Sequence, residues 1–502
     1  MEAIGISISE NLISVMTEKE KVFTSAIDAA DNSTKTIREN LESDKIKVFY
    51  DAKPVIKELI KNGFKVNRPI FDIKIAEKLI SGGEDQEKEK APTVKELISL
   101  REKLVKEITK NNLVEVCKLE FDCIFAVVQM ELNGIKLDAK KWQKLYERYL
   151  AEQKDINEEL QKEFGIENLN LNSPQQMLKA FEGQNIYLKS TSHQELSEYR
   201  GSNKVVDKFL EYRRVTKAIQ SFLAPIPQYL DPENGRLHPS YNQLGALSGR
   251  FSCEGPNIQQ IPRDDEFREC FIPDKGNKLI IADYSQIELR VAAEIANDET
   301  MIEAYKNGID LHLLTASIVT GKELKDVTKQ ERQAAKAMNF GLIYGMGAKG
   351  FQIYAKSTYG VILSLKEAVN FRNKFFDAYK GIAEWHQRTD KMINVFEYRT
   401  LSGRRVIFDT QPGISTRLNV PVQGTAADII KKALGELAQR SAEKGFRILA
   451  TVHDEILLES SEKTAEESSQ ELKKAMEKAG AHYLKKVPVL ADAKIADSWA
   501  EK

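Results

Sequence analysis

The sequence predicts a multidomain α+β protein in which a small α/β domain precedes a larger one with many helices. Its 502 residues exceed the usual size of a single domain, so several hydrophobic cores are expected. Near the N-terminus, strand-like alternation is interleaved with helical apolar spacing, which favours an α/β unit. Further along, two strand-like stretches each lead to an aspartate, and long helical patterns separate them.

Composition narrows the class of protein. Hydrophobic residues make up 42% and charged residues 30% of the chain, a balance typical of globular proteins. Because the formal net charge is −1, any surface that binds nucleic acid must be local. The four cysteines form no CxxC pair or zinc spacing, which indicates reduced thiols in a cytosol-like compartment. Neither a signal-peptide pattern nor a membrane-spanning apolar stretch is expected.

Residues 1–115 alternate between strand-like and helix-like patterns. Strands are expected in Ala3–Val15 and Lys45–Tyr50, and helices in Pro54–Lys61 and Ile73–Ile80. The glycine-containing charge run Ser81–Lys90 is typical of a loop. Residues 116–138 then predict a helix that turns into a short strand. Residues 139–225 carry long helical patterns, with a break near residues 168–174.

Two aspartates stand out as candidate metal ligands. In residues 278–290 a short apolar strand leads to Asp283, and a helical pattern follows. In residues 447–459 two apolar runs flank Asp454, which predicts a β-hairpin with this aspartate at its turn. If the two carboxylates meet, they can hold two Mg²⁺ ions about 3.5–4 Å apart. The alternative is that each binds only backbone amides.

A third segment, residues 330–345, predicts a helix with one functional face. Arg332, Lys336, Phe340 and Tyr344 follow each other at intervals of four residues, so they share that face. Two cations followed by two aromatic rings suit a nucleoside triphosphate lying along the helix. The alternative is a surface helix with basic residues at one end and an aromatic core contact at the other.

Taken together, these motifs resemble a known family. Residues 283–290, 332–345 and 452–455 resemble motifs A, B and C of family A DNA polymerases, in that family's order. Residues 248–252 together with 256–262 match one further segment of that family, and residues 421–428 match another. The resemblance covers roughly residues 116–502 and is strongest to the large, Klenow-type fragment of bacterial DNA polymerase I.

The resemblance implies a right-hand polymerase fold. Residues 116–502 would form the polymerase domain, with the thumb at 139–235, the palm at 236–310 and 411–502, and the fingers at 311–410. Residues 1–115 would form an α/β, RNase H-like domain of the 3′–5′ exonuclease type. The implied activity is template-directed addition of deoxynucleoside triphosphates to a primer 3′-hydroxyl by two-metal-ion transfer, with DNA replication or repair as its setting.

The resemblance also assigns roles at the catalytic centre. Asp283, Asp454 and the backbone carbonyl of Tyr284 would hold two Mg²⁺ ions, which Mn²⁺ can replace, while Glu455 would tune the site. Lys336 would act as a general acid. The deoxynucleotide would be bound by seven residues: Gln286, Glu288, His312, Arg332, Lys336, Phe340 and Tyr344. Glu288 and Phe340 would exclude ribonucleotides and dideoxynucleotides, respectively.

Another set would bind the primer–template. Near the primer end, minor-groove geometry would be checked by five residues: Arg250, Asn257, Gln259, Gln423 and His453. In the thumb, phosphates would be contacted by Arg213, Arg214 and Lys217. Loop-stabilising hydrogen bonds are the alternative for Asn257 and Gln259. A solvated helix face is the alternative for the thumb residues.

Proofreading is expected to be absent. A 3′–5′ exonuclease needs several carboxylates that converge on two metals, the first pair as Asp-x-Glu on a strand. The only Asp-x-Glu near the N-terminus is Asp85-Gln86-Glu87, which lies in the charge run. Asp51 and Asp72 are scattered carboxylates with no visible partners.

Some segments depart from the family pattern. Lys349–Lys366 is longer than usual in the family, and Arg405–Asn419 is shorter. Arg417 is not at the usual position of a basic residue, and Phe251 stands where leucine is common.

Two rival functions are a single-subunit RNA polymerase, which Glu288 disfavours, and a non-catalytic primer–template-binding protein, which the retained aspartates disfavour. Reverse transcription is an expected side activity.

The expected partners are primer–template DNA and deoxynucleotides, with no membrane. A monomer is expected, in the cytoplasm near the nucleoid, or in a host's cytoplasm if the source is viral.

Overall fold

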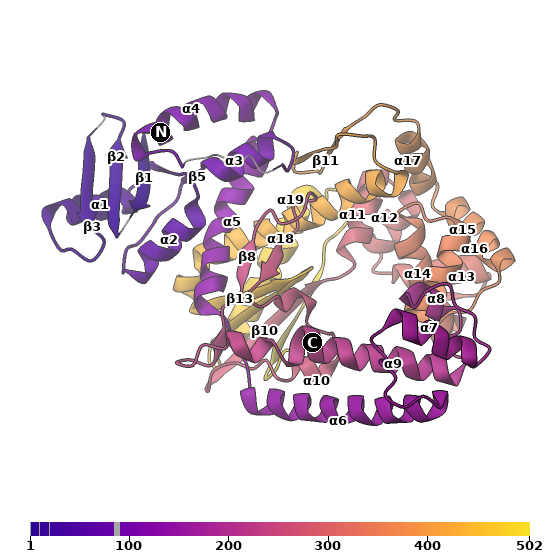
Figure 1. The fold of residues 1–502 in the computed structure, drawn as a ribbon. Helices are drawn as coiled ribbons and strands as arrows, with labels where there is room; N and C mark the ends of the chain where they lie inside the picture. Colours follow the sequence, from indigo (N-terminus) through magenta and orange to yellow (C-terminus); the bar gives the residue numbers. More distant parts are fainter. Residues whose placement is uncertain (1, 10, 20, 85–90, 502) are drawn as a thin grey trace.

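A computed structural model describes residues 2–9, 11–19, 21–84 and 91–501 of the chain. A small α/β unit at the N-terminus adjoins a larger region built around a second sheet, as Figure 1 shows. Each has its own apolar core. No helix in the described ranges combines the length and apolar character needed to cross a membrane.

The N-terminal unit is a five-stranded sheet with the order β3-β2-β1-β4-β5. Strands β1 to β3 pair antiparallel, whereas β4 and β5 run parallel to β1. The strands are β1 (Ala3–Ser9), β2 (Leu12–Thr17), β3 (Val22–Ala26), β4 (Ile46–Phe49) and β5 (Ile70–Asp72); the helices are α1 (Asn32–Glu42), α2 (Ala52–Lys61), α3 (Ile73–Ile80) and α4 (Val94–Lys110). The two helices predicted here are confirmed as α2 and α3.

One strand prediction needs correction. The strand-like alternation over Ala3–Val15 is divided between β1 and β2, which form a hairpin. Asn11 adopts a φ of 65° between them, a left-handed conformation that asparagine tolerates in turns. The charge run predicted as a loop lies largely outside the described residues, because residues 85–90 are not described.

Helix α5 (Val114–Asn133) joins the two parts. Its buried residues belong to both cores, with Val116 and Phe121 in the N-terminal one and Ala126 and Met130 in the larger one. It ends at Gly134, and the short strand β6 (Ile135–Lys136) follows, as predicted. Because a single helix contributes to both cores, the N-terminal unit is packed firmly against the rest of the chain.

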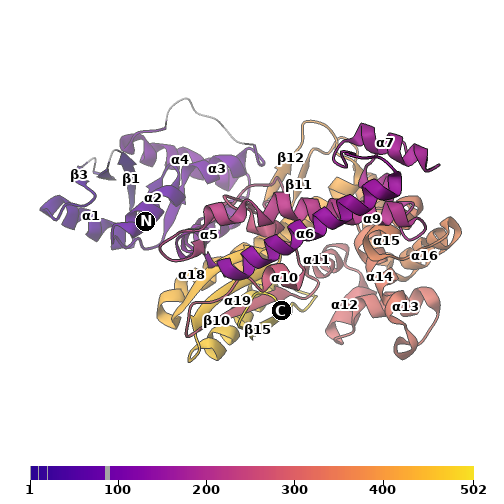
Figure 2. The ribbon, with the colours of Figure 1, turned by 60° about the horizontal axis from the view of Figure 1, so that its bottom comes forward.

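The segment predicted as the thumb is a long helical arm. Its elements are α6 (Ala139–Phe164), α7 (Pro174–Gly183), α8 (His193–Ser197), α9 (Lys204–Ala218), the π-turn η1 (Ile219–Leu223) and the 3₁₀ turn η2 (Ile226–Tyr229). The predicted break near residues 168–174 is confirmed, since α6 ends before Gly165 and Ser173 caps α7. Helices α6 and α9 run side by side in both views (Figures 1 and 2).

The second sheet is antiparallel, with the order β13-β14-β10-β15. Its strands are β10 (Asn277–Tyr284), β13 (Phe446–Val452), β14 (Glu455–Ser461) and β15 (Ala491–Ala496), and helices α11 (Ile287–Ala296), α18 (Ile414–Lys444) and α19 (Ala465–Tyr483) pack around it. The strand and hairpin predicted around Asp283 and Asp454 are confirmed as β10 and β13–β14. Short elements lead into the sheet: β7 (Arg236–Leu237), β8 (Ser240–Asn242), β9 (Ser252–Glu254), η3 (Ile258–Gln260) and α10 (Asp265–Arg268).

Between these strands lies a group of helices and a hairpin. They are α12 (Glu299–Lys306), α13 (Leu311–Thr320), η4 (Leu324–Asp326), α14 (Lys329–Leu342), α15 (Ala348–Tyr359), α16 (Leu365–Ala378), α17 (Lys380–Asp390), β11 (Glu397–Arg399) and β12 (Arg405–Ile407). The hairpin β11–β12 packs on α18 and touches the N-terminal unit, where the Ile407 N–H donates to the Gly82 carbonyl at 3.3 Å. The subdomain limits given above stay predictions.

The tip of the helical arm meets this helical group. The Lys356 ammonium of α15 donates to the carbonyl of Glu198, just after α8, at 2.6 Å. Helices α8 and α15 also contact each other, so the arm touches the helical group at this point.

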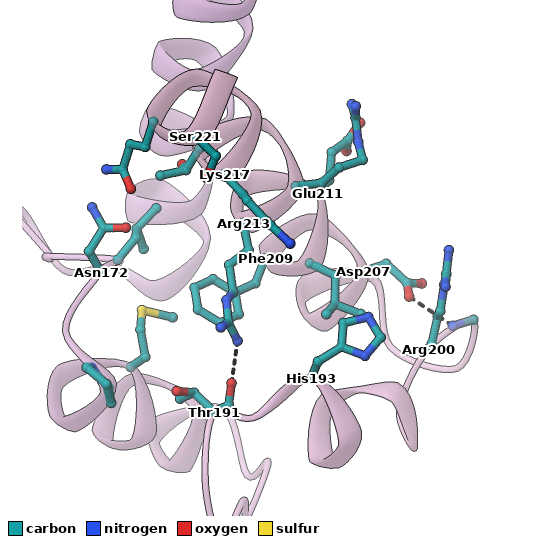
Figure 3. A pocket seen from close by; sticks show the side chains of 18 residues that line it. Asn172, Thr191, His193, Arg200, Asp207, Phe209, Glu211, Arg213, Lys217 and Ser221 are labelled. Carbon is teal, nitrogen blue, oxygen red and sulfur yellow. Dashed lines mark hydrogen bonds between the residues drawn. The ribbon is translucent and has the colours of Figure 1, made fainter. Parts of the chain in front are cut away.

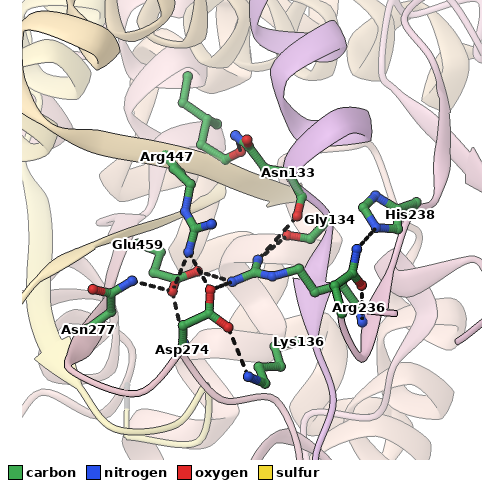
Figure 4. Close-up of polar contacts among 11 residues, drawn as sticks. Asn133, Gly134, Lys136, Arg236, His238, Asp274, Asn277, Arg447 and Glu459 are labelled. Atoms are coloured by element: carbon green, nitrogen blue, oxygen red, sulfur yellow. Dashed lines mark hydrogen bonds and ion pairs between the residues drawn. The ribbon is translucent and has the colours of Figure 1, made fainter. Parts of the chain in front are cut away.

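An ion-pair cluster fixes the end of the second sheet that lies away from Asp283 (Figure 4). The carboxylate of Glu459, with a fully buried side chain, accepts from Arg236 at 2.6 Å and Arg447 at 2.7 Å. The same two guanidinium groups each lie 2.7 Å from Asp274. Because Glu459 is in β14 and Asp274 precedes β10, the cluster ties these neighbouring strands together.

Candidate functional site

The two candidate metal ligands meet at the edge of the second sheet where β10 ends. Asp283 lies near the end of β10, and Asp454 lies in the turn between β13 and β14. In the antiparallel pairing of β10 with β14, Asp283 is opposite Glu455, the residue after Asp454. The backbone N–H of Tyr284 donates to the carbonyl of Asp454 at 3.2 Å. Residues far apart in the sequence are thus adjacent in the fold.

The donor atoms at this edge suit a hard divalent cation. Two carboxylates and the Tyr284 carbonyl are oxygen donors of the kind that Mg²⁺ prefers. Over the described ranges, no three His, Cys, Asp or Glu side chains form a group that could hold a metal. A metal at Asp283 and Asp454 would therefore take its remaining ligands from water and from a substrate such as a phosphate.

Glu455 is buried behind this edge. Its carboxylate accepts from the indole N–H of Trp499 and lies 3.5 Å from the Arg268 guanidinium. These contacts engage both carboxylate oxygens, which favours the predicted accessory role over direct metal binding.

Helix α14 presents the predicted cationic face. Arg332 donates through Nε and Nη2 to Asp310 Oδ2, at 3.2 and 2.6 Å. Phe340, two turns further along, lies with its ring centre 5.8 Å from that of His312 in α13. Lys336, between them on this face, is half-buried. The pairing of Arg332 with Asp310 was not predicted, and an incoming phosphate would compete for this arginine.

His312 is a neutral ring at physiological pH. Burial lowers its pKa to about 4, and the nearby Arg332 and Lys336 act in the same direction. The Asn339 amide nitrogen lies 2.8 Å from Nδ1, so in this orientation Nδ1 accepts and the proton is on Nε2. His312 can therefore donate a hydrogen bond without carrying a charge.

Glu288 connects three predicted site residues. One carboxylate oxygen pairs with the Arg250 guanidinium, and the other accepts from the Tyr344 hydroxyl at 2.5 Å. Tyr344 lies in the turn just beyond α14, not on the helix as its spacing predicted. Gln286 follows β10 with a φ of 57° and accepts from the Tyr305 hydroxyl at 3.1 Å.

The other predicted primer–template residues surround the same edge, with different local partners. Asn257 accepts from the Gln259 N–H at 3.1 Å, and Gln259 reaches the Thr451 carbonyl at 3.4 Å. These are the loop-stabilising bonds considered as the alternative. Gln423 is half-buried in α18, and His453 is exposed at the hairpin turn with a φ of 59°.

The three thumb candidates line one cavity. Arg213 and Lys217 line a cavity of about 1160 Å³ between α7, α8 and α9, where Arg213 donates to the Thr191 carbonyl (Figure 3). Arg214 lines the same cavity and also pairs with Glu152 of α6 at 3.0 Å. Asp207 and Glu211 also line the cavity, so its charge is mixed.

The departures from the family pattern have local structural explanations. Arg417 is buried and donates to the carbonyls of Thr389 at 2.8 Å and Met392 at 3.1 Å, which ties α18 to the end of α17. It therefore serves the packing of these helices. The segment Lys349–Lys366 contains most of α15, whose Lys356 makes the contact with the arm.

The carboxylates of the N-terminal unit have structural partners, which corrects the expectation that they have none. Asp72 accepts from the backbone N–H groups of Ala52 at 2.6 Å and Ile75 at 2.8 Å, and burial raises its pKa to about 7. Asp51 pairs with Lys74 at 3.3 Å. Asp85 and Glu87 lie outside the described residues.

Comparisons with known proteins agree with this geometry. The model of DNA polymerase family A matches residues 139–501. DNA polymerase I of Aquifex aeolicus is 36% identical over 77% of this chain, and that of Caldicellulosiruptor bescii is 31% identical over 93%. The thermostable DNA polymerase I of Thermus thermophilus is 33% identical over 74%. The chain spans 67%, 59% and 46% of these three relatives, respectively.

A solved structure has the same fold. The polymerase domain of Pol1 from M. smegmatis, in complex with DNA primer–template and a deoxynucleotide, matches with a TM-score of 0.86 and 24% identity. The match covers 99% of this chain and 95% of that one. The predicted α+β architecture of palm, fingers and thumb is thereby confirmed.

Proposed function

This chain belongs to DNA polymerase family A, and on that premise we propose that it extends a DNA primer along a template with deoxynucleoside triphosphates. The observation that carries the proposal is the meeting of Asp283 and Asp454 at one edge of the second sheet, in a chain whose helix α14 bears Arg332 and Lys336. Binding a nucleic acid alone needs no such pair of carboxylates.

We infer that Asp283, Asp454 and the Tyr284 carbonyl hold two Mg²⁺ ions, which would activate the primer 3′-hydroxyl and offset charge on the phosphates. Arg332 would leave Asp310 to bind the β- and γ-phosphates, which a guanidinium grips with two parallel hydrogen bonds. His312 would add a neutral donor from Nε2. Lys336 would hold the α-phosphate and pass a proton to pyrophosphate as it leaves.

Sugar selection would fall to Glu288 and Phe340. Arg250 engages one carboxylate oxygen of Glu288, and Tyr344 engages the other before the fingers close. A carboxylate held beside C2′ by Arg250 would leave no room for a 2′-hydroxyl. Tyr344 would stack at the templating position and move as the fingers close on a correct pair.

The chain would act without proofreading. The two described carboxylates that could have served an exonuclease, Asp51 and Asp72, are engaged with Lys74 and with two backbone amides. A labelled single strand incubated with Mg²⁺ and without nucleotides should therefore keep its full length. Steady trimming from the 3′ end would contradict this assignment.

Primer extension with aspartate variants tests the proposed activity. The unaltered chain should extend a primer with Mg²⁺ and deoxynucleotides, and Asp283→Asn or Asp454→Asn should abolish extension while DNA binding persists. Asp377→Asn is the matched control, because this aspartate is exposed and pairs with the exposed Lys380 at 3.0 Å. Primer extension by both aspartate variants would contradict the proposal. A preference of the unaltered chain for ribonucleotides would point to an RNA polymerase.

A second arm addresses the template. With a DNA primer on an RNA template, extension should be weaker than on DNA, as a side activity. The monomeric state and cytoplasmic location stay predictions from the sequence.

A further inference from the structure

A buried ion-pair network lies beneath two of the predicted primer–template segments. Its acids are Glu120 of α5 and Asp428 of α18, and its bases are Lys431 of α18 and Arg404, which immediately precedes β12. All four side chains are at most 2% exposed. Two acids and two bases balance, so no net charge is buried, and such networks demand well-defined geometry.

Arg404 is held at the centre of this network. Its Nε and Nη2 both donate to Asp428 Oδ1, at 2.9 and 2.6 Å, and Nη2 also donates to Glu120. The other oxygen of Asp428 accepts from Thr400 at 2.8 Å and Ser402 at 2.6 Å. The planar guanidinium therefore has a fixed orientation, which a lysine could not reproduce.

The loop that carries Arg250 rests on this guanidinium. Gly249 has a φ of 84°, and a Cβ there would lie 2.6 Å from Arg404 Nε and 2.7 Å from its Cζ. On the other side of Arg250, the Lys431 ammonium lies 5.2 Å from the ring centre of Phe251. Both neighbours of Arg250 thus lie against members of the network.

The segment that carries Gln423 is packed against the same parts. A Cβ on Gly424 would lie 2.5 Å from Thr400 Cγ2 and 2.9 Å from the Ser248 carbonyl oxygen. Thr400 belongs to the turn that Asp428 holds. The loop, the turn and α18 therefore form one closely packed unit with Arg250 and Gln423 on it.

We propose that Arg404 is a positioning residue that fixes Arg250 relative to Gln423 and so sets how strongly a mispaired primer end is rejected. This inference rests on the proposed polymerase function. Correct base pairs present minor-groove acceptors at constant positions, so donors held at a fixed separation recognise any correct pair. Donors that can shift also accept the displaced acceptors of a mispair. Incorporation on a matched primer depends less on their rigidity.

Two variants and one control test the proposal. Arg404→Lys keeps the charge but loses the guanidinium hydrogen bonds to Asp428 and Glu120. Gly424→Ala forces the turn and loop apart without removing a charge. Arg405→Lys is the control: it changes the same residue type at the next position, where Arg405 binds Asn111 and Glu397, each at 2.8 Å. The readout is the ratio of kcat/KM for a matched primer end to that for a mispaired one, with melting curves to verify folding.

The expected result is a loss of about tenfold or more in this ratio for both variants, because a displacement of 1 Å at a reacting centre can change rates ~10²-fold. The deoxynucleotide KM on a matched primer should change by less than about threefold, and Arg405→Lys should keep the ratio. A folded Arg404→Lys variant with an unaltered ratio would overturn the proposal. If that variant does not fold, an unaltered ratio in Gly424→Ala would overturn it. Failure of the unaltered chain to extend matched primers would instead refute the proposed function.

Discussion

Replacing Glu459 by alanine removes the central acceptor of the ion-pair cluster in Figure 4. Four donors lose this partner: the guanidinium groups of Arg236 and Arg447, the Asp274 N–H at 2.8 Å and the Asn277 amide at 2.8 Å. The Arg236 side chain is only 5% exposed, so water cannot replace the lost carboxylate.

The expected loss of stability follows from these contacts. Removing one partner of a buried ion pair costs about 3–5 kcal/mol. Arg236 keeps Asp274 at 2.7 Å and two backbone carbonyls, so the lower end, about 3 kcal/mol, applies. Unfolding entropies of about 2.1 cal/mol/K per residue give roughly 1 kcal/mol/K for a chain of this length, so Tm should fall by about 3 °C.

Calorimetry at pH 7 provides the measurement. Glu462→Ala is the matched control, because its side chain is 60% exposed and lies 3.9 Å from Lys278, an arrangement worth less than about 0.5 kcal/mol. If Glu459→Ala melts within about 1 °C of the unaltered chain, or no lower than the control, the cluster does not hold the sheet as argued.

Three further predictions concern pH and nucleotide choice. Burial raises the pKa of Glu459, but hydrogen bonds from Arg236 and Asn277 outweigh it, so the pKa lies below its ordinary value. The stabilisation of the folded state by Glu459 is then complete above the unfolded pKa of about 4.3, and it is lost as the pH falls through the pKa in the folded state. Calorimetry from pH 7 to 3 should show this loss of stability, and the loss should be smaller in Glu459→Ala. Burial lowers the pKa of His312 to about 4, so its NMR titration in the nucleotide-free protein should centre below about pH 5, and a midpoint near 6.5 would contradict the assignment. Phe340→Tyr should raise the use of dideoxynucleotides relative to deoxynucleotides in primer extension; an unchanged ratio would mean that the α14 face is misassigned.

The sequence predicted best the strands and the helix in which a clear apolar or charged periodicity coincides with a functional residue. The apolar run before Asp283 and the two runs around Asp454 are continuous and short, so strand spacing was unambiguous. The i, i+4 spacing located Arg332, Lys336 and Phe340 on one helix. It failed for Tyr344, because Gly341 and Gly345 bring the helix to an end, and tertiary contact with Glu288 decides its position.

Ion pairs between segments that are far apart in the chain could not be predicted, because they produce no pattern in a single sequence. Arg404 and Glu120 lie on segments that contact each other only after the hairpin β11–β12 packs on the rest of the chain. The engagement of Arg332 by Asp310 and of Glu288 by Arg250 is equally non-local. In the N-terminal unit, no glycine marks the turn between β1 and β2; the turn-favouring residue Asn11, which has a positive φ, was a signal in the sequence that was missed.

The position of β15 in the second sheet has a consequence for how the chain matures on the ribosome. This strand, residues 491–496, covers the flank of β10 that β14 leaves open, so the strand bearing Asp283 cannot be paired on both sides until residues 491–496 have emerged. The N-terminal sheet, whose strands end at Asp72, can assemble far earlier in synthesis. During that interval the apolar β10 presents an unpaired edge at which another chain could pair.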